Sequence, residues 1–95
     1  MKAELFWLPE AQDDLARLYE FIQPHSADAA ARAIVTLIEA AEALCAFPEK
    51  GAPWLPDPDF RELFVPFGAR GYVLRYRVLD DRVLIVRVWH TREDR

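Results

Sequence analysis

The sequence predicts a two-layer α+β fold with the element order β-α-α-β-β-β. Two stretches in the first half carry apolar residues at helical spacing, and the last third alternates like paired strands. A proline-rich stretch separates these halves. Because the two helical stretches are joined by a short link, we expect an antiparallel helical hairpin packed on one face of an antiparallel meander. A length of 95 residues is that of one domain, residues 1–95.

Residues 2–7 alternate weakly and predict a short N-terminal strand, with Ala3, Leu5 and Trp7 on one face. The helices separate this strand from the others, so we expect it to join the sheet at an edge.

The first helix is predicted to begin at Pro9, because proline is tolerated where the missing N–H has no helical partner. Leu8 precedes it, at the position where a capping side chain would be favourable. The missing cap costs roughly 0.5–2 kcal/mol of stability. Pro24 ends the helix. One apolar stripe runs along it: Ala11, Leu15, Leu18 and Ile22.

The second helix is predicted to begin after Ser26, a favourable N-cap residue, and to end at Phe47-Pro48. Its apolar stripe extends from Ala30 to Cys45 and is rich in alanine, which favours helix and close packing. The one cysteine cannot form an internal disulfide and is expected to be a core thiol.

Residues 48–59 are predicted to form a loop, because four prolines remove four backbone donors and exclude a helix or a central strand. Trp54 and Leu55 are expected to fold back over the core. A strand is predicted from Arg61 to Val65, before Pro66.

A hairpin of residues 72–79 and 82–89, turning at Asp80-Asp81, completes the predicted sheet. Strict alternation places an apolar set on the core face: Tyr72, Leu74, Tyr76, Val78, Leu84, Val86 and Val88. The opposite face would mix apolar and cationic side chains: Val73, Arg75, Arg77, Leu79, Val83, Ile85, Arg87 and Trp89. Such a mixed face is a candidate surface for binding another molecule.

The net charge of −4 is unevenly distributed. Residues 1–59 carry four basic and eleven acidic side chains, whereas residues 60–95 carry eight arginines, no lysine and five acids. Arginine binds carboxylates and phosphates in pairs and stacks on aromatic rings. Two interpretations remain open: charged strand edges that prevent aggregation, or a surface for an acidic partner.

The sequence lacks the motifs that are typical of several classes of protein. There is no membrane-length apolar run and no signal peptide, so a cytoplasmic protein is expected. His25 and His90 are far apart without a metal-ligand motif, and no phosphate-binding loop or nucleophile motif occurs, so neither a metal nor a cofactor is expected. His90, next to Arg92, could act as a general base, but a structural or binding role is favoured.

The order and spacing of several segments resemble the RelE/ParE superfamily of type II toxin–antitoxin toxins. The resemblance covers nearly the whole chain. Its segments are residues 7–15 with Tyr19 and Ile22, the alanine-rich second helix, residues 44–48 with Gly51, residues 76–78, and residues 83–90 with Arg92.

The resemblance implies one of two activities. The ParE type is associated with blocking DNA gyrase through protein binding, and it is the branch we favour. The RelE type is a ribosome-dependent mRNA endonuclease, which needs a basic cluster with a Tyr or His near the C-terminus. Val73 stands where one endonuclease type has Arg, and no Tyr follows His90. If the chain is a nuclease, the expected catalytic residues are Arg70, His90 and Arg92.

The resemblance also implies a cognate antitoxin whose flexible, acidic C-terminal segment wraps the toxin in a hetero-oligomer. Direct nucleic-acid binding is not expected from the acidic net charge. The residues predicted to bind the antitoxin or target are Arg75, Arg77, Val83, Ile85, Arg87, Trp89, His90 and Arg92. The alternative is that Arg75, Arg77 and Arg87 pair with acids of the chain's own helices.

Overall fold

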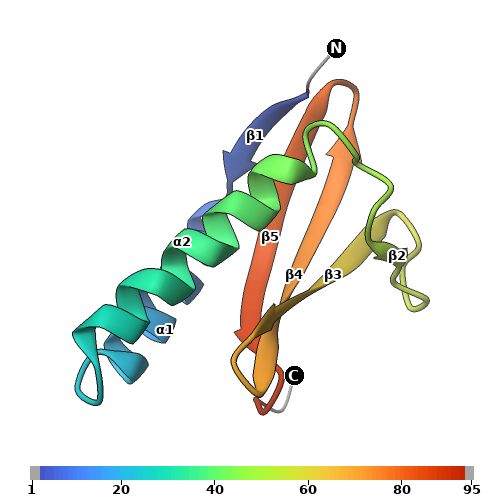
Figure 1. The fold of residues 1–95 in the computed structure, drawn as a ribbon. Helices are drawn as coiled ribbons and strands as arrows, with labels where there is room; N and C mark the ends of the chain where they lie inside the picture. The colour runs from blue at the N-terminus through green and yellow to red at the C-terminus, as the bar shows by residue number, and fades with distance from the viewer. Residues whose placement is uncertain (1–2, 94–95) are drawn as a thin grey trace.

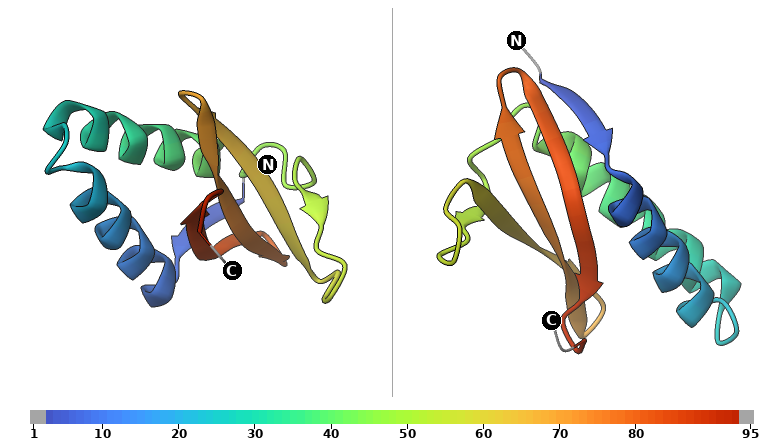
Figure 2. Two further views of the ribbon diagram at one scale, coloured as in Figure 1. Left: turned by 90° about the horizontal axis from the view of Figure 1, so that it is seen from below. Right: turned by 180° about the vertical axis from the view of Figure 1, so that it is seen from behind.

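The computed structural model describes residues 3–93 as two helices packed on one face of a five-stranded sheet (Figure 1). Along the chain the elements are β1 (Glu4–Trp7), α1 (Pro9–Ile22), α2 (Ala27–Ala43), β2 (Ala52–Pro53), β3 (Phe60–Phe67), β4 (Arg70–Leu79) and β5 (Arg82–His90). The strand order is β1-β5-β4-β3-β2. Both helices lie on the same side of the sheet, and we call the other side the open face (Figure 2).

The predicted α+β order is confirmed, including the edge position of the N-terminal strand. β1 pairs in parallel with β5, and Leu5 lies opposite Val83. The alternating side chains Ala3, Leu5 and Trp7 pack against the core, as expected. No helix within residues 3–93 is long and apolar enough to cross a bilayer.

The helix ends follow the capping chemistry of the sequence. Leu8 makes no side-chain cap at the start of α1, and Pro9 occupies the first turn. At the start of α2 the hydroxyl of Ser26 accepts a hydrogen bond of 3.0 Å from the backbone N of Ala29. The turn between the helices is short, so the two helices form the expected hairpin.

The core lies between the helical hairpin and the sheet. Leu37 of α2 and Leu44, the C-cap residue of that helix, are fully buried, and Cys45 is also buried. From β4, three alternate residues point into the core, as predicted: Tyr72, Leu74 and Tyr76.

A β-bulge makes the predicted faces of β5 wrong over half of its length. Arg75 pairs with Arg87, but the next residue, Tyr76, pairs with Ile85, so Val86 is an extra residue in β5. An extra residue inverts the alternation beyond it. Val83 and Ile85 are therefore fully buried in the core. They do not share a face with Arg75 and Arg77, and Leu84 and Val86 are only partly buried.

The proline-rich stretch also differs from the prediction. Residues 52–53 form the short edge strand β2, which proline tolerates because an edge needs fewer donors. Leu55 is 84% exposed, so it does not cover the core. β3 continues through Pro66, where no strand pairs on its outer side, because β2 reaches only Arg61 and Glu62.

Candidate functional site

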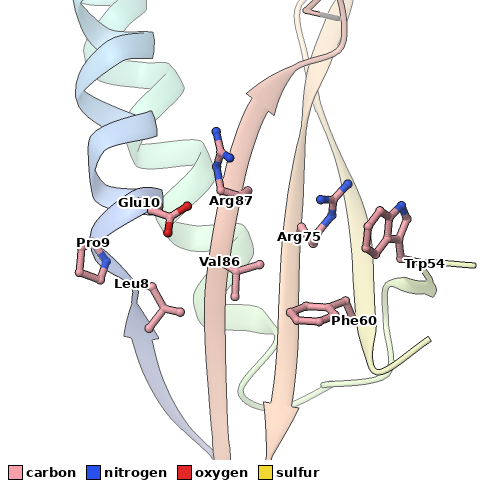
Figure 3. A pocket seen from close by; sticks show the side chains of 8 residues that line it. All are labelled: Leu8, Pro9, Glu10, Trp54, Phe60, Arg75, Val86 and Arg87. Atoms are coloured by element: carbon pink, nitrogen blue, oxygen red, sulfur yellow. The ribbon is translucent and has the colours of Figure 1, made fainter. Parts of the chain in front are cut away.

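A groove of about 400 Å³ lies on the open face and contains part of the predicted binding surface (Figure 3). We call it the open-face groove. It extends from the start of α1 across β5 and β4 to the β2–β3 segment. Its lining residues are Leu8, Pro9, Glu10, Trp54, Phe60, Arg75, Val86 and Arg87.

Arg75 is held in this groove by two kinds of contact. Its guanidinium carbon lies 3.8 Å from the ring centre of Trp54 and 4.9 Å from that of Trp89. Its Nη2 and Nε atoms lie 2.8 and 3.0 Å from a carboxylate oxygen of Glu62 on β3. The guanidinium contacts two indole rings and forms an ion pair with Glu62. Together these contacts fix the side chain, and the ion pair neutralises its charge. Arg77 lies over the ring of Phe60, at 5.7 Å from the ring centre.

The contributions of Trp54 and Glu62 were not foreseen from the sequence. Glu62 lies directly opposite Arg75 in the β3–β4 pairing, so the pair depends on strand register. The sequence does show an acidic residue in the preceding strand that could pair with Arg75. The strand register that places Glu62 opposite Arg75 was not predicted from the sequence. Trp54 lies in the proline-rich stretch, and the sequence had predicted that its side chain would pack over the core.

Arg87 was predicted to clamp a partner's carboxylate, but it binds a carboxylate of the chain's own helix. Asp14, only 4% exposed, lies on α1. Its Oδ2 atom accepts hydrogen bonds from Arg87 Nε and from the backbone N of Val88, both at 2.8 Å. This is the internal pairing that the sequence left open as an alternative. Burial alone would raise the pKa of Asp14, but the hydrogen bonds from Arg87 and Val88 outweigh it, and the pKa lies below its usual value.

The same carboxylate connects α1 to the C-terminal turn through Arg17. Arg17 Nη2 lies 3.3 Å from Asp14 Oδ1, and Arg17 Nη1 lies 2.7 Å from Glu93 Oε2. The pair with Glu93 raises the pKa of Arg17, so the guanidinium stays charged. Glu93 Oε1 also accepts a hydrogen bond of 3.0 Å from the backbone N of His90. These contacts position the turn that carries His90 and Arg92.

A second and larger groove, of about 740 Å³, lies between the C-terminal half of α1 and the end of the sheet. We call it the helix-side groove. It brings together the three residues expected for a nuclease, Arg70, His90 and Arg92. The His90 ring packs edge-on against Tyr72, with 5.2 Å between ring centres. The remaining lining residues are Arg17, Leu18, Phe21, Ile22 and Glu93.

The hydrogen bonding of His90 determines what its imidazole can do. The backbone N of Arg92 donates to His90 Nδ1 at 3.1 Å. Since Nδ1 is the acceptor, the neutral ring carries its proton on Nε2 and offers a donor there rather than a base. Burial, followed by the charges of Arg92 and Arg70, lowers the pKa of His90, so the ring is neutral at pH 7.

The structure thus separates the predicted binding residues into four groups. Arg75, Arg77 and Trp89 lie on the open face, and His90 and Arg92 line the helix-side groove. Val83 and Ile85 are in the core, and Arg87 is bound to Asp14 at the edge of the open-face groove.

Comparison with known proteins identifies the family. The sequence model of the ParE toxin of type II toxin–antitoxin systems, parDE, matches residues 5–95. The chain belongs to this family. It is therefore a toxin of the type II toxin–antitoxin class, within the RelE/ParE superfamily that the sequence resembled.

Similar toxins are known from Caulobacter vibrioides. The chain is 40% identical to Toxin RelE3 over 87 residues, which cover 92% of both proteins. It is 36% identical to Toxin RelE1 over 85 residues, covering 90% of this chain and 89% of the relative. Among solved structures, a chain of the chromosomal ParDE toxin–antitoxin system from P. aeruginosa matches with a TM-score of 0.78 and 22% identity. That match covers 94% of this chain and 96% of the other, and it supports the fold.

Proposed function

We propose that this toxin acts by binding a target protein, DNA gyrase, without catalysing a reaction, and that a cognate antitoxin neutralises it. The observation that carries the proposal is the hydrogen bond from Arg92 N to His90 Nδ1. It leaves the neutral imidazole with a donor at Nε2, so His90 is not available as the base that activates a ribose hydroxyl. Tyr72 does not replace it, because burial raises its pKa above the usual value.

The charge distribution supports the same proposal. A protein that rests on ribosomal RNA gains from a strong positive field. This chain has a net charge of −4, and on the open face Arg75 is neutralised by Glu62. The accessible part of the predicted binding surface is Arg75, Arg77 and Trp89 on the open face, with His90 and Arg92 at the helix-side groove.

Two assays on the purified toxin test the proposal. We expect inhibition of gyrase supercoiling, and no cleavage of mRNA in a reconstituted translation system. His90→Ala should weaken the inhibition of gyrase by no more than about tenfold, as loss of one binding contact does, because no proton transfer depends on the imidazole. Cleavage of ribosome-bound message with supercoiling unaffected would show that the proposal is wrong.

A second candidate function is ribosome-dependent mRNA cleavage. It is favoured by the groove that assembles Arg70, His90 and Arg92, and by the names of the RelE toxin relatives. In that function the two arginines would stabilise the negative charge of a pentacoordinate phosphate, and His90 Nε2 would donate to it. The base for the 2′-hydroxyl would be a group other than His90. This candidate predicts loss of cleavage in His90→Ala and Arg92→Ala.

A further inference from the structure

The turn that follows β5 carries His90 and Arg92, and Glu93 holds it from two sides. The backbone N of Glu93 donates to the carbonyl O of His90 at 2.9 Å, and Glu93 Oε1 accepts from the backbone N of His90 at 3.0 Å. One residue therefore fixes both the donor and the acceptor of the His90 backbone. Because the backbone N of Arg92 donates to the His90 ring at 3.1 Å, the same turn also sets the orientation of the imidazole.

Arg17 ties this turn to α1 and to β5. Its Nη1 atom lies 2.7 Å from Oε2 of Glu93, which is the carboxylate oxygen that His90 does not use. Its Nη2 atom donates to the carbonyl O of Val88 at 3.3 Å and lies 3.3 Å from Oδ1 of Asp14. Asp14 is itself nearly buried and is held by Arg87. The guanidinium is therefore anchored on a helix and a strand, and its remaining N–H groups hold Glu93 in place.

The exposure of this ion pair indicates that it acts locally rather than on the stability of the whole domain. The side chains of Arg17 and Glu93 are 40% and 26% exposed. Ion pairs with this much access to water contribute little to global stability. A turn outside the helices and strands opens at low free energy unless side chains tie it down. Loss of the pair should therefore loosen the turn while the rest of the domain stays folded.

We infer that Arg17 and Glu93 are positioning residues of the toxin. They hold His90 and Arg92 in the orientation in which these two side chains meet the target, and they act only through them. The inference rests on the proposed function, because it takes the rim of the helix-side groove as part of the surface that binds the target. A target contact made from a fixed turn does not have to pay the entropy of ordering that turn on binding.

The first test measures the local effect by amide hydrogen exchange of the intact toxin. Arg17→Gln leaves Glu93 in place, yet it should raise the exchange rate of the His90 amide on the order of tenfold or more, because the carboxylate that accepts from this amide is no longer anchored. Amides of the core strands should exchange as in the wild type. The matched control is Arg32→Gln, which removes an ion pair of 3.0 Å with Asp28 on α2 and should leave the His90 amide unchanged.

The second test measures inhibition of gyrase supercoiling in two mutant cycles. Arg17→Gln and Glu93→Ala should each weaken inhibition on the order of tenfold, and the two together should weaken it no more than the stronger single variant, because they break one connection. Neither should add to the loss in His90→Ala/Arg92→Ala. Arg32→Gln should inhibit as the wild type does. Thermal unfolding checks that every variant is folded, and Glu93→Ala serves where Arg17→Gln disturbs α1.

The outcomes separate failure of the inference from failure of the proposed function. A further loss when Arg17→Gln is added to His90→Ala/Arg92→Ala would show that Arg17 contacts the target itself, and it would overturn the inference alone. Unchanged exchange of the His90 amide in Arg17→Gln would do the same. If the wild-type toxin does not inhibit gyrase, the proposed function is wrong. The two cycles are then measured by growth arrest on expression of the toxin, where the same additivity decides the inference.

Discussion

Replacing Asp14 with alanine should be strongly destabilising, because this carboxylate joins α1 to the sheet at the bulge. It is 4% exposed and accepts hydrogen bonds from Arg87, Arg17 and the backbone N of Val88. Alanine would leave the buried Val88 N–H without its acceptor and two guanidinium groups without this carboxylate.

The magnitude follows from how far each group can recover its lost contact. An unsatisfied buried N–H costs about 1–3 kcal/mol. The Arg87 and Arg17 side chains are 32% and 40% exposed, so water can replace part of their lost contacts. Arg17 also keeps its pair with Glu93. We therefore expect a total loss of about 2–4 kcal/mol in the free energy of unfolding. Removing one partner of a fully buried ion pair costs somewhat more, about 3–5 kcal/mol.

Urea unfolding followed by tryptophan fluorescence measures this loss. Asp13→Ala is the matched control, because Asp13 is the exposed neighbour in the same helix, and its effect should be within about 0.5 kcal/mol. A loss below about 1 kcal/mol for Asp14→Ala would refute the argument that this carboxylate holds the helix to β5.

The pH dependence provides a further check on the same residue. The folded-state pKa of Asp14 is below the ordinary value of 3.8, so the unfolded state binds the proton more readily as pH falls. The stability that Asp14 contributes is therefore complete above about pH 4 and is lost as pH falls through the lower, folded-state pKa. The difference between wild type and Asp14→Ala should shrink over that acidic range, and a constant difference would contradict the assignment.

Three other outcomes follow from the structure. Tyr76→Phe should cost about 1–3 kcal/mol in urea unfolding, because the Tyr76 hydroxyl joins two backbone groups at 2.8 and 2.9 Å, whereas the exposed Tyr19→Phe should be neutral. Glu62→Ala should cost less than about 1 kcal/mol, since its pair with Arg75 is partly exposed, but it should alter tryptophan emission by releasing the stacked guanidinium; unchanged emission would contradict the stack. Because the pKa of His90 is lowered in the folded state, stability should fall as pH drops through about 6.5, and His90→Gln should reduce that slope; an unchanged slope would count against it.

Local chemistry was sufficient to predict most of the elements. Pro9 and Ser26 mark the starts of the helices, and the spacing of Leu15, Leu18 and Ile22 identifies the buried side of α1. The residue types in β4 place its alternate side chains correctly, because that strand keeps strict alternation. These features depend on residues close together in the chain, so they can be read without knowing the partners.

The candidate site was only partly predictable, because its contacts join distant segments. Arg70, His90 and Arg92 were named together as the residues that a nuclease would use, and the structure brings them together at one groove. The pairing of Arg87 with Asp14 spans 73 residues, and nothing local to either residue indicates it. Trp54 was assigned to packing because a proline-rich loop does not reveal which ring it will bring over Arg75.

The amino-acid sequence by itself determined the order of the two helices and the four longer strands and the two-layer architecture, since these follow from periodicity, capping and turn residues. The family resemblance came from the order and spacing of particular segments. Only the tertiary structure decided which face each half of β5 presents. One extra residue at Val86 inverts the alternation and moves Val83 and Ile85 from the open face to the core. A bulge depends on pairing between strands, so it has no signature in the alternation of a single strand.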